Sequence, residues 1–106
     1  MPKYLFEARY AAEGAQGLAS EGGTARRAAV TKMIEGSGGK LESFHFAFGD
    51  VDAFVIVELP DAVTAAAAAV TINKSGEVTV RTVPLLTPEE MDAACKKSVS
   101  YRPPGS

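Results

Sequence analysis

The sequence has few of the residues that form disulfides or bind metals. Its 106 residues include one cysteine, Cys95, one histidine, His45, and no tryptophan. A single cysteine cannot form an internal disulfide or a thiolate cluster, which excludes disulfide scaffolds and the usual zinc modules. Because there is also only one histidine, we expect no metal and no cofactor.

The sequence also lacks a long hydrophobic run and an excess of positive charge. The longest apolar run spans Ala65 to Val70, far short of the ~18 residues that cross a membrane, and the first residues contain no apolar signal region. The 11 basic and 13 acidic residues are spread along the chain and give a net charge of -2. No basic surface is expected to follow a phosphate backbone. We therefore expect a cytoplasmic protein that binds neither membranes nor nucleic acids.

The rest of the composition is typical of one globular domain. Hydrophobic residues make up 46% of the chain and charged residues 23%. We assign residues 1–97 to this domain and residues 98–106, which contain Arg-Pro-Pro-Gly, to an irregular tail. A domain of this size has a modest core, so burial between subunits would add stability. We expect a homo-oligomer, either a dimer or a larger ring.

The polarity pattern predicts the order of the elements. Alternating segments bounded by turn residues predict strands over residues 3–10, 40–48, 53–59 and 77–86. Helical spacing and capping residues predict helices over residues 25–35, 62–72 and 88–97. Residues 13–19 can form a short helical turn, which Gly14 and Gly17 weaken.

This order predicts an α+β protein with a ferredoxin-like βαββαβ unit and an extra C-terminal helix. Such a unit forms a four-stranded antiparallel sheet with its helices on one face. The other face needs a cover. Two sheets stacked face to face would provide it and would form a dimeric α/β barrel.

Alternate residues of a strand point to opposite faces of the sheet, which divides the strand residues into two sets. The apolar set, expected to pack under the helices, contains Tyr4, Phe6, Ala8, Phe44, Phe46, Phe48, Val55, Val57, Val78 and Val80. The mixed set contains Leu5, Glu7, Arg9, Ser43, His45, Phe54, Ile56, Glu58, Thr79, Arg81 and Val83. Chemistry is therefore expected on the second face.

The ionisable residues of the mixed face are the candidate ligand-binding residues: Glu7, Arg9, His45, Glu58 and Arg81. Histidine titrates near neutrality, so His45 is also the candidate catalytic base, with Glu7 or Glu58 to orient it. The alternative is an ordinary solvated face, on which these charges form cross-strand pairs.

A second candidate site lies at the start of the first long helix. Its residues are Gly22, Gly23, Thr24, Arg26 and Arg27. Two flexible glycines, a helix N-terminus and two guanidinium groups can together bind a small anion such as phosphate or a carboxylate. Alternatively, the glycines only form the turn and the arginines pair with acidic residues such as Glu21.

Four stretches of the chain carry a family resemblance: EGGTARR (21–27), GGKLESFHFAFGDVDAFVIVELPD (38–61), SGEVTVRTVPLLTPEE (75–90) and YRPPG (101–105). They resemble the GYD-domain family of small bacterial proteins over most of the chain. Of the naming Gly-Tyr-Asp, the chain has Gly49 and Asp52, but Val51 stands where the tyrosine is expected. The resemblance implies a ferredoxin-like relative of the dimeric α/β barrels and does not imply a reaction.

Three hypotheses for the function follow. The first is an oligomeric small-molecule-binding protein whose pocket is the mixed sheet face. The second is a cofactor-independent enzyme acting on a small aromatic or carbonyl substrate, with His45 as base and Arg81 or Arg9 balancing an oxyanion. The third is a structural interaction module in which the mixed face only packs against a partner chain.

Overall fold

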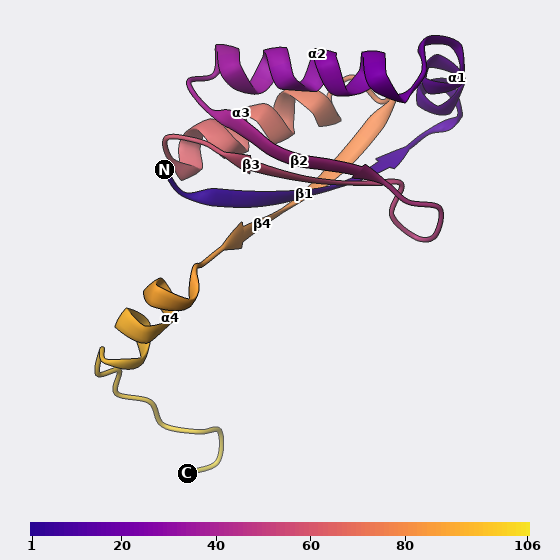
Figure 1. The fold of residues 1–106 in the computed structure, drawn as a ribbon. Coiled ribbons are helices and arrows are strands. Elements are labelled where there is room, and N and C mark those ends of the chain that lie inside the picture. Colours follow the sequence, from indigo (N-terminus) through magenta and orange to yellow (C-terminus); the bar gives the residue numbers. More distant parts are fainter.

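The computed structural model describes residues 1–106 and contains four strands and four helices (Figure 1). In chain order they are β1 (Lys3–Tyr10), α1 (Ala12–Glu21), α2 (Gly23–Gly36), β2 (Lys40–Phe46), β3 (Ala53–Glu58), α3 (Ala62–Asn73), β4 (Val78–Leu85) and α4 (Pro88–Cys95). None of the helices combines the length and the apolar character needed to span a membrane.

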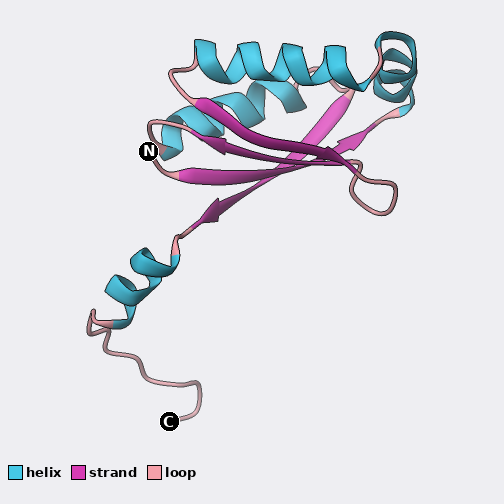
Figure 2. Cartoon of the chain, viewed as in Figure 1, coloured by secondary structure: helices cyan, strands magenta, loops and turns pink.

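The four strands form one antiparallel sheet in the order β2-β3-β1-β4. Helices α2 and α3 lie on the same face of this sheet, and the opposite face has no helix over it (Figures 1 and 2). We call the uncovered side the open face. The predicted α+β fold with a four-stranded antiparallel sheet is therefore confirmed.

The core lies between the sheet and the two covering helices. It is a cluster of eight buried residues: Tyr4, Phe6, Ile34, Val55, Val57, Leu59, Ala65 and Ala68. The alternation predicted for β1 and β3 is confirmed, because the even-numbered residues of β1 and the odd-numbered residues of β3 point under the helices. Ala65 and Ala68 lie three residues apart on α3, so this part of the helix approaches the sheet with methyl groups.

Strand β2 departs from the predicted alternation at its end. Phe44 packs against the core, but Phe46 is 41% exposed and Phe48 is fully exposed. The strand ends at Phe46, where the chain enters a loop that is closed by a hydrogen bond from the Ala47 amide to the Asp52 carbonyl. The prediction that Phe48 lies in the core was wrong, because the strand does not reach this residue.

Helix α1 is longer than the helical turn predicted for residues 13–19. The amide of Ala11, just before the helix, donates a hydrogen bond to the Glu77 carbonyl at 2.9 Å, which holds the start of α1 next to the start of β4. A Cβ atom at Gly14 would collide with the same carbonyl oxygen. Gly14 lowers the helix propensity of α1, but the close approach to Glu77 requires a residue without a side chain.

Helix α4 and the tail project from the end of β4, away from α2 and α3 (Figure 1). No residue of α4 is buried, and the radius of gyration of the chain is 16.7 Å, whereas a compact chain of this length has about 13 Å. The start of α4 is a capping box. The Thr87 hydroxyl accepts from the Glu90 amide at 3.1 Å, and the Glu90 carboxylate accepts from the Thr87 amide at 2.9 Å.

Asp61 caps the N-terminus of α3. Its carboxylate accepts hydrogen bonds from the amide and the hydroxyl of Thr64, each at 2.8 Å. These two bonds, the amide first, hold the pKa of Asp61 below its ordinary value of 3.8. Because the folded pKa is depressed, the stabilisation is complete above the unfolded pKa and is lost as the pH falls through the folded pKa.

We therefore expect Asp61→Asn, which caps equally well and does not titrate, to separate the cap from its charge. The difference in free energy of unfolding between the wild type and Asp61→Asn should be constant from about pH 5 to pH 7. Below about pH 4 the wild type should lose stability relative to Asp61→Asn. Urea unfolding across this range measures it. Asp61→Ala should be less stable than both at neutral pH. A difference that does not vary with pH would contradict the assignment.

Candidate functional site

The open face brings three of the predicted ligand-binding residues into one row across the sheet. The register pairs His45 of β2 with Phe54 of β3, Phe54 with Glu7 of β1, and Glu7 with Arg81 of β4. Glu7 and Arg81 are therefore direct cross-strand neighbours of opposite charge. Phe54 lies between His45 and Glu7, and its side chain is 37% exposed.

The middle of the open face is apolar. In the next row, Ser43, Ile56, Leu5 and Val83 lie side by side across the four strands. Ile56, Leu5 and Val83 are half-buried even though no helix lies above them. We call these three residues, together with Leu85 at the end of β4, the apolar belt. Its members Leu5, Ile56 and Val83 separate the row containing His45 from a second ionic row, in which Leu85 is the register partner of Lys3.

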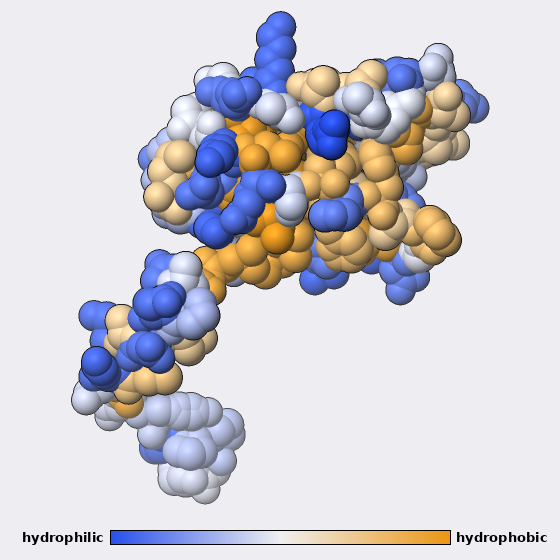
Figure 3. All heavy atoms as spheres, in the orientation of Figure 1, coloured by the Kyte–Doolittle hydropathy of each residue, from blue (hydrophilic) through white to orange (hydrophobic).

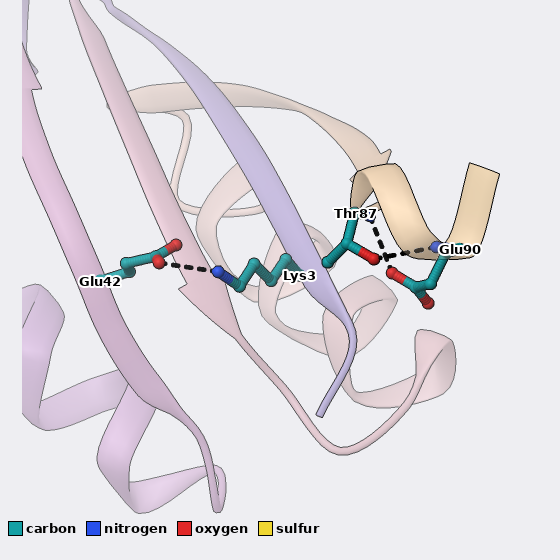
Figure 4. Close-up of polar contacts among 4 residues, drawn as sticks. All are labelled: Lys3, Glu42, Thr87 and Glu90. Carbon is teal, nitrogen blue, oxygen red and sulfur yellow. Dashed lines mark hydrogen bonds and ion pairs between the residues drawn. The ribbon is translucent and has the colours of Figure 1, made fainter. Parts of the chain in front are cut away.

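The second ionic row contains Glu58, which lies opposite Lys3 on β1 and opposite Lys40 on β2. Lys3 instead forms an ion pair with Glu42 at 2.8 Å (Figure 4). The hydrogen bond from Lys3 to Glu42 and the charge of Glu42 raise the pKa of the Lys3 ammonium group. The β2 register shifts between Leu41 and Ser43, and Glu42 is the extra residue in this irregularity. A bulge of this kind redirects a side chain that simple alternation would place on the helix face.

Two of the predicted ligand-binding residues lie apart from the row of His45. Glu58 belongs to the other end of the face, beyond the apolar belt. The guanidinium group of Arg9 donates a hydrogen bond from Nε to the Asp50 carbonyl at 2.6 Å. Arg9 thus holds the loop between β2 and β3, and this contact engages the group that was expected to balance an oxyanion.

His45 is exposed, and its side chain makes no hydrogen bond within the chain. Neither Glu7 nor Glu58 orients its imidazole, since Phe54 stands between His45 and Glu7 and Glu58 lies in the other ionic row. No three His, Cys, Asp or Glu side chains are grouped so that they could hold a metal ion. His45, the predicted base, therefore lies on the open face, but no residue of the same chain makes a contact that orients it.

The residues of the predicted anion site diverge at the start of α2. Gly22 precedes the helix with a φ of 86°, a conformation that favours glycine, and no side chain caps the helix. Thr24 and Arg27 line an open hollow of about 260 Å³ with Gly23, Phe44 and Phe46. Arg26 faces another cavity instead, and its guanidinium lies 3.8 Å from the Glu21 carboxylate.

The cavity that Arg26 faces lies between the sheet and helices α2 and α3, and we call it the helix-side cavity. It has a volume of about 50 Å³, and 11 of its 12 lining residues are hydrophobic. Arg26 is the exception. This cavity was not predicted from the sequence. The available signal was the alanines at positions 8 and 53 of the predicted strands, whose small side chains leave space above a sheet.

A second hollow of about 130 Å³ adjoins the helix-side cavity, and we call it the vestibule. The two share Tyr10, Arg26 and Val78. Burial raises the pKa of the Tyr10 hydroxyl; the carboxylates of Asp52 and Glu21 also raise it, and Arg26 opposes them. The vestibule is further lined by Gly14, Gly17, Leu18, Glu21 and Glu77.

A third hollow lies on the open face, where β4 meets α4. Its volume is about 340 Å³, and its walls include the Lys3–Glu42 ion pair, Ile56, Leu86 and Thr87 (Figure 4). In Figure 3, hydrophobic surface runs along the lower side of the domain and continues to the start of α4. Leu86 in this region is 59% exposed. The apolar belt thus continues into an uncovered groove at the joint.

Comparison with known proteins gives one family match. The model of the GYD domain matches residues 4–95, which covers most of the chain and all four strands of the sheet. No curated protein and no solved structure matches the chain.

Two glycines of the vestibule allow its walls to be tested. Gly14→Ala should reduce the free energy of unfolding by about 1–3 kcal/mol, because the added methyl group meets the Glu77 carbonyl oxygen. A Cβ atom at Gly17 would meet nothing within 4 Å, so Gly17→Ala should stabilise α1 by about 0.5–1 kcal/mol. Urea unfolding of both variants measures the contrast. Equal stability of the two variants would contradict the close approach of α1 to β4.

Proposed function

The chain belongs to the GYD-domain family, and we propose that it acts as a self-associating small-molecule-binding protein. Two copies meet through their open faces and enclose the row of His45, Phe54, Glu7 and Arg81. The observation that carries this proposal is the register of the sheet, which aligns three ionisable residues beside an apolar belt on a face that no helix covers.

The apolar belt supports a second copy as the cover of the open face. A sheet with helices on one side only buries its second face when another layer packs on it. Leu5, Ile56 and Val83 form a continuous apolar row, and Leu85 and Leu86 extend it toward α4. Association of two such faces removes both belts from water, and an uncovered apolar surface of this kind is typical of an interaction surface.

The exposure of helix α4 also supports a second copy as the partner of the open face. An isolated helix of eight residues is marginal in water even when it is well capped, and α4 buries no residue against its own domain. Met91 on the helix and Val99 and Tyr101 in the tail are exposed apolar side chains. A second copy packed on the open face would lie beside the groove at the β4–α4 joint, where it would give α4 a surface to pack on.

The ionic row supports a small polar ligand between the two copies. Stacked sheets lie about 10 Å apart, so charged side chains between them must be paired or solvated. Glu7 and Arg81 can pair with each other across the strands. His45 has no partner in the chain, and Phe54 beside it offers an aromatic surface. A small molecule with a planar apolar part and a hydrogen-bonding group would fit this row.

The self-association is tested by placing a charge in the apolar belt. We expect the wild-type chain to sediment as a dimer and Val83→Lys to weaken the dimer by about tenfold or more, because an unpaired ammonium group is costly to bury. Val63→Lys is the matched control: Val63 is 79% exposed on α3, on the covered side of the sheet. It should dimerise like the wild type. Sedimentation equilibrium measures all three chains.

A monomeric wild-type chain, or equal weakening by Val83→Lys and Val63→Lys, would contradict association through the open face. Native mass spectrometry of the dimer purified without denaturation tests the ligand. We expect additional mass that is lost in Glu7→Gln/Arg81→Gln, a pair of substitutions that removes both charges and keeps polar side chains. A dimer that never carries additional mass would contradict small-molecule binding. It would favour the hypothesis of a structural interaction module.

A further inference from the structure

The helix-side cavity results from how the two long helices divide the sheet between them. Helix α2 packs mainly on β2, and α3 packs mainly on β4, which are the two edge strands. The middle strands β3 and β1 therefore form the floor of the cavity. Ala53 and Ala8 are register partners on these strands and both line the cavity. Two methyl groups side by side leave space that larger residues would fill.

The cavity has a polar mouth. Tyr10 and Arg26 line both the helix-side cavity and the vestibule, so they lie where the two meet. The Tyr10 hydroxyl makes no hydrogen bond within the chain. The guanidinium of Arg26 has only the Glu21 carboxylate near it, at 3.8 Å, which is longer than a charge-assisted hydrogen bond. Two donors at the mouth are thus available to an oxygen ligand.

The dimensions restrict the ligand to a narrow chain. The inner volume of about 50 Å³ is well below the roughly 150 Å³ of a cavity that holds benzene. An unbranched hydrocarbon chain is slimmer than a ring. Its end would lie in the inner cavity, and the rest of the chain would extend through the mouth toward the vestibule, whose volume is about 130 Å³. Beyond the mouth, Glu21 and Glu77 line the vestibule, and their carboxylates disfavour a second negative charge on the ligand.

We propose that the helix-side cavity binds a short unbranched monocarboxylic acid. Its hydrocarbon chain lies among Val30, Met33 and Ile72, and its carboxylate replaces Glu21 on Arg26 and accepts a hydrogen bond from Tyr10. Guanidinium and carboxylate groups match in geometry and form paired hydrogen bonds. This site lies on the covered side of the sheet, so it is independent of the open face and of the function proposed above.

The test uses the full chain and three probes that share one pentyl chain: hexanoate, 1-pentanol and pentylammonium. Methyl NMR titration reports where each probe binds. Hexanoate should shift the methyl signals of Val30, Met33 and Ile72 and should bind about tenfold or more tightly than 1-pentanol, since the two differ only in the polar group at the end of the pentyl chain. Pentylammonium should not shift them. Butyrate should bind more weakly than hexanoate, by about fourfold per methylene.

Four variants localise the site. Arg26→Gln should weaken hexanoate binding about tenfold or more, and Lys32→Gln, which removes a positive charge from the same helix away from the cavity, should not. Gly17→Leu should block the vestibule, because Gly17 lines this hollow and a Cβ atom there meets nothing within 4 Å. Gly36→Leu is its matched control: a Cβ atom at Gly36 also meets nothing within 4 Å, and Gly36 lines no hollow. It should bind like the wild type.

Urea unfolding of the same variants shows that they are folded and assigns any loss of binding to the site. Equal binding of hexanoate and 1-pentanol, equal weakening by Arg26→Gln and Lys32→Gln, or unchanged binding in Gly17→Leu would overturn the proposal. Shifts confined to Ile56 and Val83 would also overturn it, because they would place hexanoate on the open face. None of these outcomes depends on whether the chain is a monomer or a dimer, because the helix-side cavity lies on the covered side of the sheet.

Discussion

Strand β1 is the constraint on which the rest of the structure depends, because it is paired on both sides. It forms ladders with β3 and with β4, so its register determines which residues share a row across the sheet. Its alternation places Tyr4, Phe6 and Ala8 under the helices and leaves Leu5 and Glu7 on the open face. A shift of one residue would exchange these two sets and would bury Glu7 in the core.

The two faces then differ for a physical reason. On the covered side, α2 and α3 pack on the edge strands and the small side chains of Ala8 and Ala53 lie on the middle strands, which leaves a residual cavity in the core. On the open face, an apolar belt lies between two rows of charged residues, and one short helix extends from the sheet without packing on it. The core of the covered side forms within one chain, whereas no other layer of the chain packs on the open face.

Much of this arrangement could be predicted from the sequence, since strand alternation and helical spacing are local properties. They gave the order of the elements, the two faces of β1 and β3, and the position of Glu7, His45 and Arg81 on one face. The pairing of Glu7 with Arg81 needed the strand order. Phe48 was misplaced because the end of β2 is set by the hydrogen bonds of a loop, and Glu42 changed faces because of an irregularity in the ladder.

The remaining features depend on spacing between elements, which local patterns do not contain. Gly14 weakens a helix in isolation and is required where α1 meets the Glu77 carbonyl. Arg26 and Arg27 are adjacent in sequence, yet they face different hollows on the two sides of α2. The helix-side cavity depends on the distance between two helices that pack on opposite edges of the sheet.

The central claim is that the open face is completed by a second copy of the chain. The most direct measurement is an isotope-filtered NOE experiment on a mixture of ¹³C-labelled and unlabelled chains, which detects contacts between copies only. We predict intermolecular NOEs at the methyl groups of Leu5, Ile56 and Val83. The absence of intermolecular NOEs, or NOEs confined to the methyl groups of α2 and α3, would contradict the account.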